Sequence, residues 1–222
     1  MSCAVCHIVA AAPVALEPFE LCEGDLLIAA DGGYAACLEA GLQPCELIGD
    51  FDSLPGGVPA QAACPVTVLP RAKDDTDLMV CVRRALELGA RELHLHRALG
   101  GDLGHTLAAV KVLMWLREQG AWGVLSGGGQ ALVALTPGDG LVDLAPWAPA
   151  ACCSEDGGLR VGVRVSVFAA GGDARDVVER GLAWELEGAT LRSSDHLGVS
   201  NEVRAPHPLV GVGEGSLLVV IG

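Results

Sequence analysis

Short apolar runs alternate with helix-like patterns from residue 6 to about residue 135. Apolar runs of this length, bounded by turn residues, are typical of buried strands. The predicted strands cover residues 7–11, 26–30, 46–48, 66–69 and 92–96, with a last one at 123–125 or 131–135. Three helices are predicted between them, at 34–40, from Thr76 as N-cap to Gly89, and at 106–119. Alternating strands and helices predict a mainly parallel, Rossmann-like sheet with helices on both faces.

The pattern changes after residue 136. Turn-forming Pro, Gly and Asp residues gather at 136–140 and 145–149, and no helical period follows them. Short alternating segments predict strands at 160–169, 182–186, 189–192 and 216–221. We therefore expect an α/β domain over residues 1–136 and a small antiparallel sheet domain over residues 140–222, which is large enough to fold alone.

Charge and composition narrow the possible partners. The 222 residues are 51% hydrophobic and carry 14 Lys and Arg against 28 Asp and Glu, a net charge of −14. Such a field repels polyanions, so neither a nucleic acid nor an acidic membrane is an expected partner. No apolar run reaches the roughly 20 residues of a membrane span, and the first basic residue is Arg71, which does not fit a secretory signal. We expect a cytoplasmic protein.

The cysteine and histidine motifs give only weak indications of a haem or metal site. The nine cysteines are odd in number and scattered, which suits reduced thiols. The run from Cys3 to His7 has the spacing of covalent haem attachment, but it continues directly into a predicted buried strand, so we set haem aside. His94 and His96 could be ligands on one strand face; with no third ligand apparent, a structural role is favoured.

Carboxylates follow two of the predicted strands. Asp50 and Asp52 come after the third strand, and extended backbone would turn both to one side at the ligand end of the sheet. Asp77 comes after the fourth strand, at the start of a helix. Three such charges repel one another by on the order of 10 kcal/mol without a counter-ion. Hard oxygen ligands without a His or Cys cluster favour Mg²⁺, which usually shares its shell with substrate phosphates.

These acids also have an ordinary structural interpretation. Asp50 and Asp52 could cap a turn, and Asp74, Asp75 and Asp77 could interact favourably with the dipole of the helix that follows them. The concentration of charge in Gly-Asp-x-Asp-Ser, with no evident cap recipient, favours the metal site.

Several motifs resemble, in order and spacing, those of the thiamine pyrophosphokinase (thiamine diphosphokinase) family. In the first domain these are Asp31-Gly32-Gly33, Gly41-Leu42-Gln43-Pro44, Gly49-Asp50-Phe51-Asp52-Ser53-Leu54 and Lys73-Asp74-Asp75-Thr76-Asp77. In the second they are Gly181-Leu182-Ala183-Trp184, Gly198-Val199-Ser200-Asn201-Glu202 and Gly215-Ser216-Leu217-Leu218-Val219-Val220. The resemblance covers nearly the whole chain.

The resemblance implies an enzyme that transfers the β,γ-pyrophosphoryl group of ATP to the hydroxyl of thiamine, giving thiamine diphosphate and AMP. It also implies an α/β catalytic domain, a β-sandwich thiamine-binding domain, and a homodimer whose subunits share the thiamine pocket. By resemblance, the catalytic and Mg²⁺-binding residues are Asp50, Asp52 and Asp77, and the nucleotide-binding residues are Asp31, Lys73, Asp74, Thr76, Arg97 and His105. The thiamine-binding residues are Trp184, Ser200 and Asn201.

Some of these residues have alternatives. Trp184 could stack on the cationic thiamine, with a cation–π contact of about 0.5–2 kcal/mol, or be a core aromatic. Ser200 and Asn201 could form an ordinary turn. Asp52 or Asp77 could accept the thiamine hydroxyl proton, although a carboxylate that binds Mg²⁺ is a weak base.

One loop departs from the family pattern. Where the family usually has Gly-Gly-Arg-x-Asp-His, this chain has Gly100-Gly101-Asp102-Leu103-Gly104-His105. An arginine that would hold phosphate is thus replaced by an acid. We expect Arg97 to reach the phosphates instead and Asp102 to pair with a metal or with Arg97. Two other functions stay open: a catalytically impaired protein that binds thiamine or its diphosphate, and a pyrophosphokinase for another hydroxymethyl heterocycle such as a pterin.

Overall fold

The structure is a computed structural model that describes residues 5–52, 57–58 and 62–222. Cys3 of the haem-like motif and Ser53 and Leu54 of the acidic motif lie outside these residues. The chain divides into two compact units, Met1–Gly128 and Gly129–Gly222, called here the N-terminal and C-terminal units. The predicted domain boundary at 136–140 lies beyond the first strand of the C-terminal unit, and the predicted domain limits stay a prediction.

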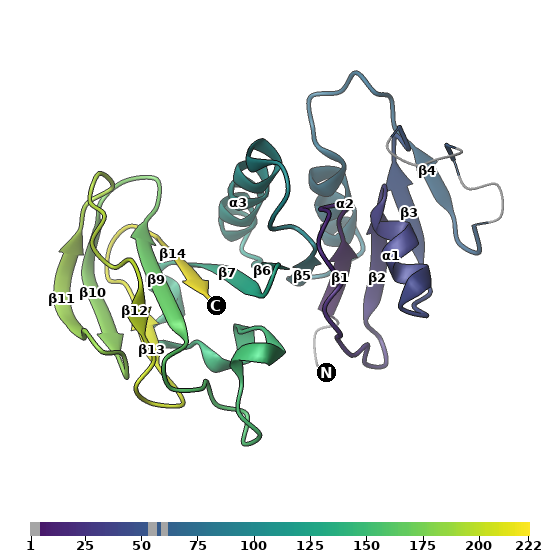
Figure 1. The fold of residues 1–222 in the computed structure, drawn as a ribbon. Coiled ribbons are helices and arrows are strands. Elements are labelled where there is room, and N and C mark those ends of the chain that lie inside the picture. The colour runs from purple at the N-terminus through teal and green to yellow at the C-terminus, as the bar shows by residue number, and fades with distance from the viewer. Residues whose placement is uncertain (1–4, 53–56, 59–61) are drawn as a thin grey trace. The chain divides into compact units, whose positions relative to one another are not determined.

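The N-terminal unit contains a parallel sheet (Figure 1). Its neighbouring strands are, in order, β6 (Trp122–Gly127), β5 (Glu92–His96), β1 (Val5–Val9), β2 (Leu26–Ala30), β3 (Glu46–Gly49) and β4 (Val66–Val68). Every pair in this series runs parallel. Parallel neighbours need crossover connections, and three of these connections carry the helices α1 (Gly33–Glu39), α2 (Asp77–Glu87) and α3 (Leu103–Glu118).

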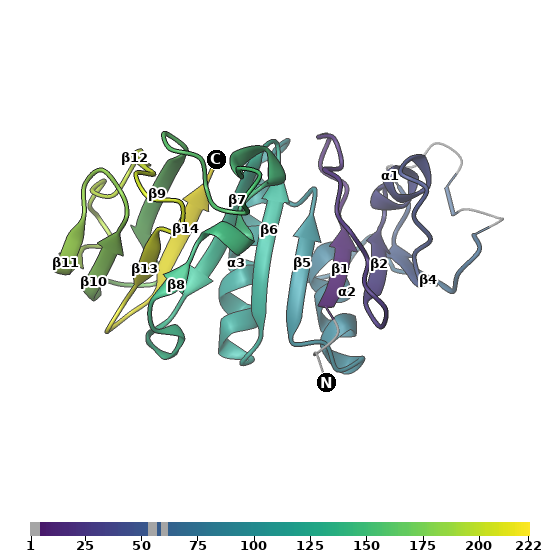
Figure 2. The ribbon, with the colours of Figure 1, turned by 90° about the horizontal axis from the view of Figure 1, so that it is seen from below.

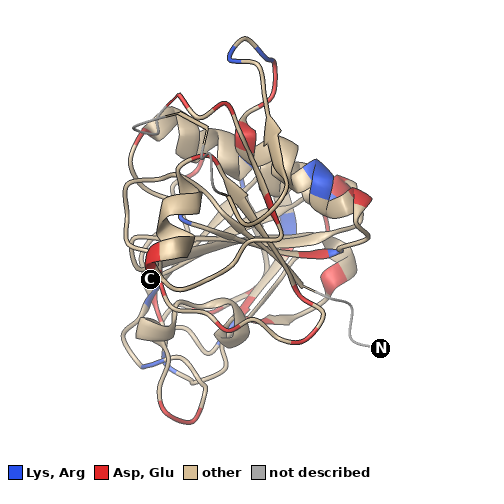
Figure 3. Cartoon of the chain, turned by 90° about the vertical axis from the view of Figure 1, so that its right-hand side faces the viewer, with Lys and Arg blue, Asp and Glu red and all other residues tan. Residues whose placement is uncertain are grey.

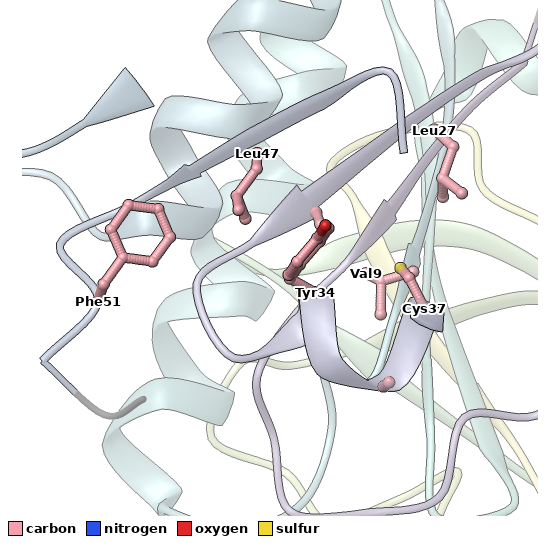
Figure 4. Packing of buried hydrophobic residues seen from close by; sticks show 8 residues of the cluster. Val9, Leu27, Tyr34, Cys37, Leu47 and Phe51 are labelled. Atoms are coloured by element: carbon pink, nitrogen blue, oxygen red, sulfur yellow. The ribbon is translucent and has the colours of Figure 1, made fainter. Parts of the chain in front are cut away.

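Helix α1 covers one face of this sheet over an apolar cluster (Figure 4). Tyr34 and Cys37 of α1 pack with Val9, Leu27 and Leu47, which come from three adjacent strands. Alternate residues of β1 point to the other face, where α2 packs. The apolar alternation thus accounts for helices on both faces, as predicted.

Specific polar and small residues set where the helices begin. Thr76 accepts a hydrogen bond from the Met79 N–H at 3.2 Å and caps α2, as predicted. Helix α3 starts at Leu103, one turn earlier than predicted, because Asp102 caps it. Helix α1 passes so close to β1 that a Cβ on Gly33 would lie 1.9 Å from the Val9 carbonyl oxygen. Only glycine fits there.

The C-terminal unit is built from two antiparallel sheets (Figure 2). The first joins β12 (Asn201–Glu202), β9 (Arg164–Ala169), β14 (Leu217–Ile221) and β7 (Gln130–Leu135). The second joins β11 (Leu186–Leu191), β10 (Ala174–Arg180), β13 (Leu209–Gly211) and β8 (Val142–Asp143). Three short 3-10 helices, Pro137–Asp139, Ala145–Trp147 and Ala150–Cys152, occupy the turn-rich stretch. The α/β plus all-β fold class is confirmed.

The second unit differs from the predicted strands in several places. Residues 182–185 of the expected strand at 182–186 form a loop, in which Leu182 makes an isolated bridge with Val203, and Leu186 begins β11. The sequence pattern also missed the short strands β8, β12 and β13 and the longer β10, whose buried side includes the charged residue Glu179. Across the described residues, no helix has both the length and the apolar character that crossing a membrane requires.

Candidate active site

A cavity of about 500 Å³ lies in the N-terminal unit, where the loops after β1 to β5 and the start of α3 come together. The carboxyl ends of parallel strands are where such sheets bind ligands. Its described lining includes six aspartates and three basic residues, namely Asp31, Asp50, Asp52, Asp75, Asp77, Asp102, Arg71, Lys73 and Arg97. His105 and Thr76 also line it. Acidic segments are spread over loops and helix ends, in keeping with the net charge of −14 (Figure 3).

Lys73 joins two of these acids. Its Nζ lies 2.6 Å from Asp50 Oδ2 and 3.0 Å from Asp77 Oδ1. The two carboxylates therefore cannot be farther apart than the sum of these distances, although they come from different crossover connections. Both side chains are mostly shielded from solvent, Asp50 being 12% and Asp77 23% exposed. The loops after β3 and β4 thus converge on one cation.

The pKa shifts of this group show how its charges interact. The hydrogen bond from Lys73 lowers the pKa of Asp50. Burial raises the pKa of Asp77, and the nearby charges of Asp50 and Asp31 add to that rise despite the opposing effect of Lys73. Burial disfavours the charged form of Lys73, but its hydrogen bonds to both carboxylates outweigh this and raise its pKa. Lys73 neutralises only part of the negative charge, so the group retains a demand for a further cation.

The backbone between Asp50 and Asp52 is not extended. Phe51 has a φ of 57°, in the left-handed region, and its ring is 2% exposed in the apolar cluster beneath α1 (Figure 4). The Asp52 N–H faces Asp50 Oδ1 at 3.4 Å, as in a tight turn. The expected alternation of an extended chain is therefore wrong here. Both carboxylates still line the cavity, because the turn is anchored by the buried ring between them.

Asp31 enters the cavity from the end of β2. It has a φ of 46° and is 7% exposed, and its N–H donates to the Ile48 carbonyl of β3 at 2.9 Å. A Cβ on Gly49 would lie 2.9 Å from the Asp31 Cα. The glycine that ends β3 therefore lets the Asp31 loop approach Asp50 closely.

The segment that precedes α2 divides its acids between the cavity and solvent. Thr76, Asp75 and Asp77 line the cavity, and Asp75 also lies 3.4 Å from Arg83 Nε of α2. Asp74 is exposed and is not among the lining residues, so the structure does not bring this expected nucleotide ligand to the others. The cap fixes Thr76 between Asp75 and Asp77 at the cavity, while Asp74 faces solvent.

The structure explains why the loop at residues 100–105 differs from the family pattern. Asp102 Oδ1 accepts the His105 N–H at 3.0 Å and so caps α3, which differs from the expected pairing with a metal or with Arg97. Arg97 lines the cavity, has a φ of 52°, and donates from Nε to the Val14 carbonyl at 2.8 Å. His105 lies on the first turn of α3 and lines the same cavity. A helix cap thus stands where the family pattern has a basic residue.

The expected thiamine-binding residues lie in the C-terminal unit. Asn201 is 4% exposed and forms two hydrogen bonds with the Trp184 backbone. Its Nδ2 donates to the Trp184 carbonyl at 2.7 Å, and its Oδ1 accepts from the Trp184 N–H at 3.1 Å. The Trp184 side chain is 63% exposed, so the alternative of a core aromatic is wrong. Ser200 is exposed at a φ of 60°, and its N–H donates to Ser166 Oγ at 3.0 Å.

Sequence reasoning missed two groups of buried polar residues. Glu179 is fully buried, receives a hydrogen bond from Asn201 Nδ2 at 3.0 Å, and has a pKa raised by burial. The local sequence offered no signal for it, because the residue interrupts the apolar pattern of β10. The second group is His7 of β1, which lies beside His94 and His96. The statement that no third ligand accompanies these two histidines is therefore wrong.

Comparison with models of protein families shows which family this chain is related to. The model of the thiamin pyrophosphokinase catalytic domain matches residues 20–122, and the model of the thiamin pyrophosphokinase vitamin B1 binding domain matches residues 156–213. This chain belongs to the thiamin pyrophosphokinase family. Members of this family are ATP-dependent pyrophosphotransferases, and the chain matches both the catalytic domain and the vitamin B1 binding domain.

Solved structures of this family share the fold. Thiamine pyrophosphokinase from Bacillus subtilis is 22% identical, with a TM-score of 0.81 and 98% of each chain covered. Thiamin pyrophosphokinase from Geobacillus thermodenitrificans is 25% identical, with a TM-score of 0.79 and coverage of 98% of this chain and 97% of that one. The enzyme from Candida albicans is 10% identical, with a TM-score of 0.71 and coverage of 98% and 88%. A search of curated proteins found no match.

Proposed function

We propose that the acidic cavity binds ATP with Mg²⁺ and that the chain transfers the β,γ-pyrophosphoryl group to the hydroxyl of thiamine, releasing AMP. The observation that carries this proposal is the convergence of Asp50, Asp77 and Lys73 at the cavity, from two crossover loops. For such a transfer, the protein mainly has to position the two reactants and neutralise charge on the phosphates.

The donor set of the cavity fits Mg²⁺. Asp50, Asp52 and Asp77 offer hard carboxylate oxygens, and the raised pKa of Asp77 reflects negative charge that Lys73 does not fully offset. These three residues would hold the ion, which when bound would neutralise charge that develops on the transferred group. Lys73, pinned between two carboxylates, is held in a fixed position to contact phosphate oxygens.

Other cavity residues have roles in binding and orientation. Arg97, whose Nε is tied to the Val14 carbonyl, supplies a fixed positive charge near the loop where the family has its arginine. Thr76, His105 and Asp31 contribute polar groups on the nucleotide side. Without a bound metal, burial raises the pKa of Asp77 while the hydrogen bond from Lys73 lowers that of Asp50, so Asp77 is the stronger base of the two until it binds Mg²⁺.

We also propose that thiamine stacks on Trp184 and that two copies of the chain together complete its pocket. The support is a group of exposed apolar side chains in the C-terminal unit, with Trp184 63%, Leu197 58% and Val199 47% exposed. Asn201 fixes the backbone of Trp184 and so limits the movement of the indole. A planar cation such as thiamine suits an indole face.

A cytoplasmic location also stays our proposal. The support is that the eight described cysteines are all free, which suits a reducing compartment.

The test is an assay of AMP release from ATP with and without thiamine, in the presence of MgCl₂. We expect AMP only with thiamine, and a loss of at least about 100-fold in Asp50→Asn and Asp77→Asn, because charge stabilisation is the main catalytic effect. Asp195→Asn, an exposed aspartate of the C-terminal unit, is the matched control and should keep full activity. Saturable thiamine binding without AMP would instead identify an impaired binding protein, and AMP release with a hydroxymethylpterin would identify the other pyrophosphokinase.

A further inference from the structure

Three histidines meet on one face of the parallel sheet, in β1 and β5. In the ladder between these strands His7 pairs with His94, and Val9 pairs with His96. His94 and His96 are two residues apart and therefore point to the same face. One ligand nitrogen from each of the three rings lies within 4.8 Å of the others. None of the three is among the described residues that line the acidic cavity.

Two of the rings already have close to the spacing of metal ligands. His7 Nδ1 lies 3.0 Å from His96 Nε2. Bonds of about 2.0–2.1 Å to a tetrahedral zinc ion place two ligand nitrogens roughly 3.3 Å apart, so a small movement would seat an ion between them. The His94 side chain is 27% exposed, which provides a path for the ion from solvent.

One nitrogen of each ring also has an oxygen nearby. His7 Nε2 lies 3.7 Å from Asp25 Oδ2, His96 Nδ1 lies 3.4 Å from Ser126 Oγ, and His94 Nε2 lies 3.0 Å from Glu92 Oε1. The Asp25 carboxylate is itself held by the N–H groups of Val5 and Cys22, at 3.0 and 2.8 Å. Histidines that bind metals almost always contact such an outer partner, which fixes the tautomer and the ring orientation.

The surroundings keep the buried rings neutral and fixed. Burial lowers the pKa of His7 to about 4 and that of His96 to about 3, so both are in the uncharged form that binds metals at neutral pH. The Phe19 ring stacks on both, with centroid distances of 4.7 Å to His7 and 3.9 Å to His96. The two imidazoles therefore have little freedom to turn away.

We propose that His7, His94 and His96 form a binding site for zinc(II), separate from the acidic cavity, with a fourth position open to water. Imidazole nitrogens prefer zinc and similar transition metals to Mg²⁺, whereas the carboxylates of the cavity have the opposite preference. The ion would link β1 to β5 and stabilise the N-terminal unit.

Zinc binding to the full chain tests this site. The protein is treated with a chelator, dialysed, and titrated with Zn²⁺ in millimolar MgCl₂, which competes with Zn²⁺ for exposed carboxylates. We expect one zinc ion per chain in the titration, a higher Tm, and, with Co²⁺ in place of Zn²⁺, the visible absorption of a tetrahedral site. None of these readouts depends on catalysis, so the outcome is independent of the function proposed above.

The variants use the accessible ligand, since substitution of a buried histidine could prevent folding. His94→Gln should weaken zinc binding by at least about 100-fold and Glu92→Gln by about tenfold, because loss of an outer partner alone costs about 10–100-fold. His196→Gln, an exposed histidine of the C-terminal unit, should bind zinc like the parent chain. Zinc binding that His94→Gln leaves unchanged, or no zinc binding at all, would overturn the proposal and leave a hydrogen-bonded cluster.

Discussion

The Lys73 ammonium lies 2.6 Å from the Asp50 carboxylate and bridges the two crossover loops that line the cavity. Asp77 completes the bridge on the other side at 3.0 Å. The lysine thus holds together two acids that would otherwise repel each other, and it does so before any ligand binds.

Replacing Lys73 by Met should lower the free energy of unfolding by about 1–3 kcal/mol, because two half-buried carboxylates then face each other without a cation. Millimolar Mg²⁺ should recover part of this loss in the variant and change the parent chain less. Urea denaturation with and without MgCl₂ measures both effects. A variant as stable as the parent without Mg²⁺ would show that the acids do not interact.

Asp102 should behave as a helix cap. Asp102→Ala is expected to reduce the free energy of unfolding by about 1 kcal/mol, while Asp102→Asn should leave it nearly unchanged, because asparagine caps helices as well as aspartate does. Urea midpoints of the two variants provide the comparison. Equal destabilisation by Ala and Asn would mean that the charge of Asp102 matters more than its hydrogen bond to the His105 N–H.

Asn201 and Glu179 should depend on each other. Asn201→Ala leaves the buried Glu179 without its amide donor and frees the Trp184 backbone, so we expect a loss of about 2–4 kcal/mol and a higher KM for thiamine. The KM for ATP should change little, since Asn201 is not among the residues that line the acidic cavity. Adding Glu179→Met should restore part of the stability, and additive losses in the double variant would refute the coupling.

The close approach of α1 to β1 predicts that Gly33 tolerates no side chain. Gly33→Ala would put a Cβ 1.9 Å from the Val9 carbonyl oxygen and should cost on the order of 3 kcal/mol or more. Gly138→Ala is the control, since nothing lies within 4 Å of its added Cβ, and it should change stability by less than about 0.5 kcal/mol. Thermal or urea unfolding of both variants measures these losses. Similar losses of stability in Gly33→Ala and Gly138→Ala would contradict the close packing of α1 on β1.

Acid should destabilise the chain through its buried histidines. The pKa values of His7 and His96 in the folded chain are about 4 and about 3, below the value of about 6.5 for an unfolded histidine. The unfolded chain therefore binds more protons between these values, so the free energy of unfolding falls as the pH is lowered through about 6.5 and keeps falling toward the folded-state pKa values. Between pH 7 and pH 5 we expect a loss on the order of 2–4 kcal/mol.

Urea denaturation at pH 7, 6 and 5 in the presence of a chelator measures this loss. His96→Phe removes one of the two groups and should flatten the dependence, whereas His196→Gln, at an exposed position, should not. An unchanged slope in His96→Phe would indicate that another group titrates.

The fold could be predicted where a local sequence pattern alone determines the bounds of a strand or helix. The bounds of β2 and β5 agree with the predicted strands, and the Thr76 cap was recognisable from its place before an amphipathic helix. Strand β10 was missed because Glu179 occupies a buried position and breaks its apolar alternation. A buried charge depends on a partner from another strand, and no local pattern reveals that partner.

The candidate site shows the same division. Motifs at the ends of strands indicated which acids would meet, but the Lys73 bridge and the exposure of Asp74 depend on side-chain directions in an irregular loop. His7 lies 89 residues from His96, and only the register of two parallel strands brings them together. That register is set by packing of the whole sheet, which a single sequence does not reveal.

Phe51 belongs at once to the acidic turn and to the apolar cluster beneath α1 (Figure 4). Its ring packs in the same cluster as Leu47 and Tyr34, while its immediate neighbours Asp50 and Asp52 reach the cavity. Mutations that loosen this cluster would therefore shift the carboxylates as well as weaken the fold. In a random library screened for lost turnover, substitutions at Leu47 and Tyr34 should be recovered beside those of the acids.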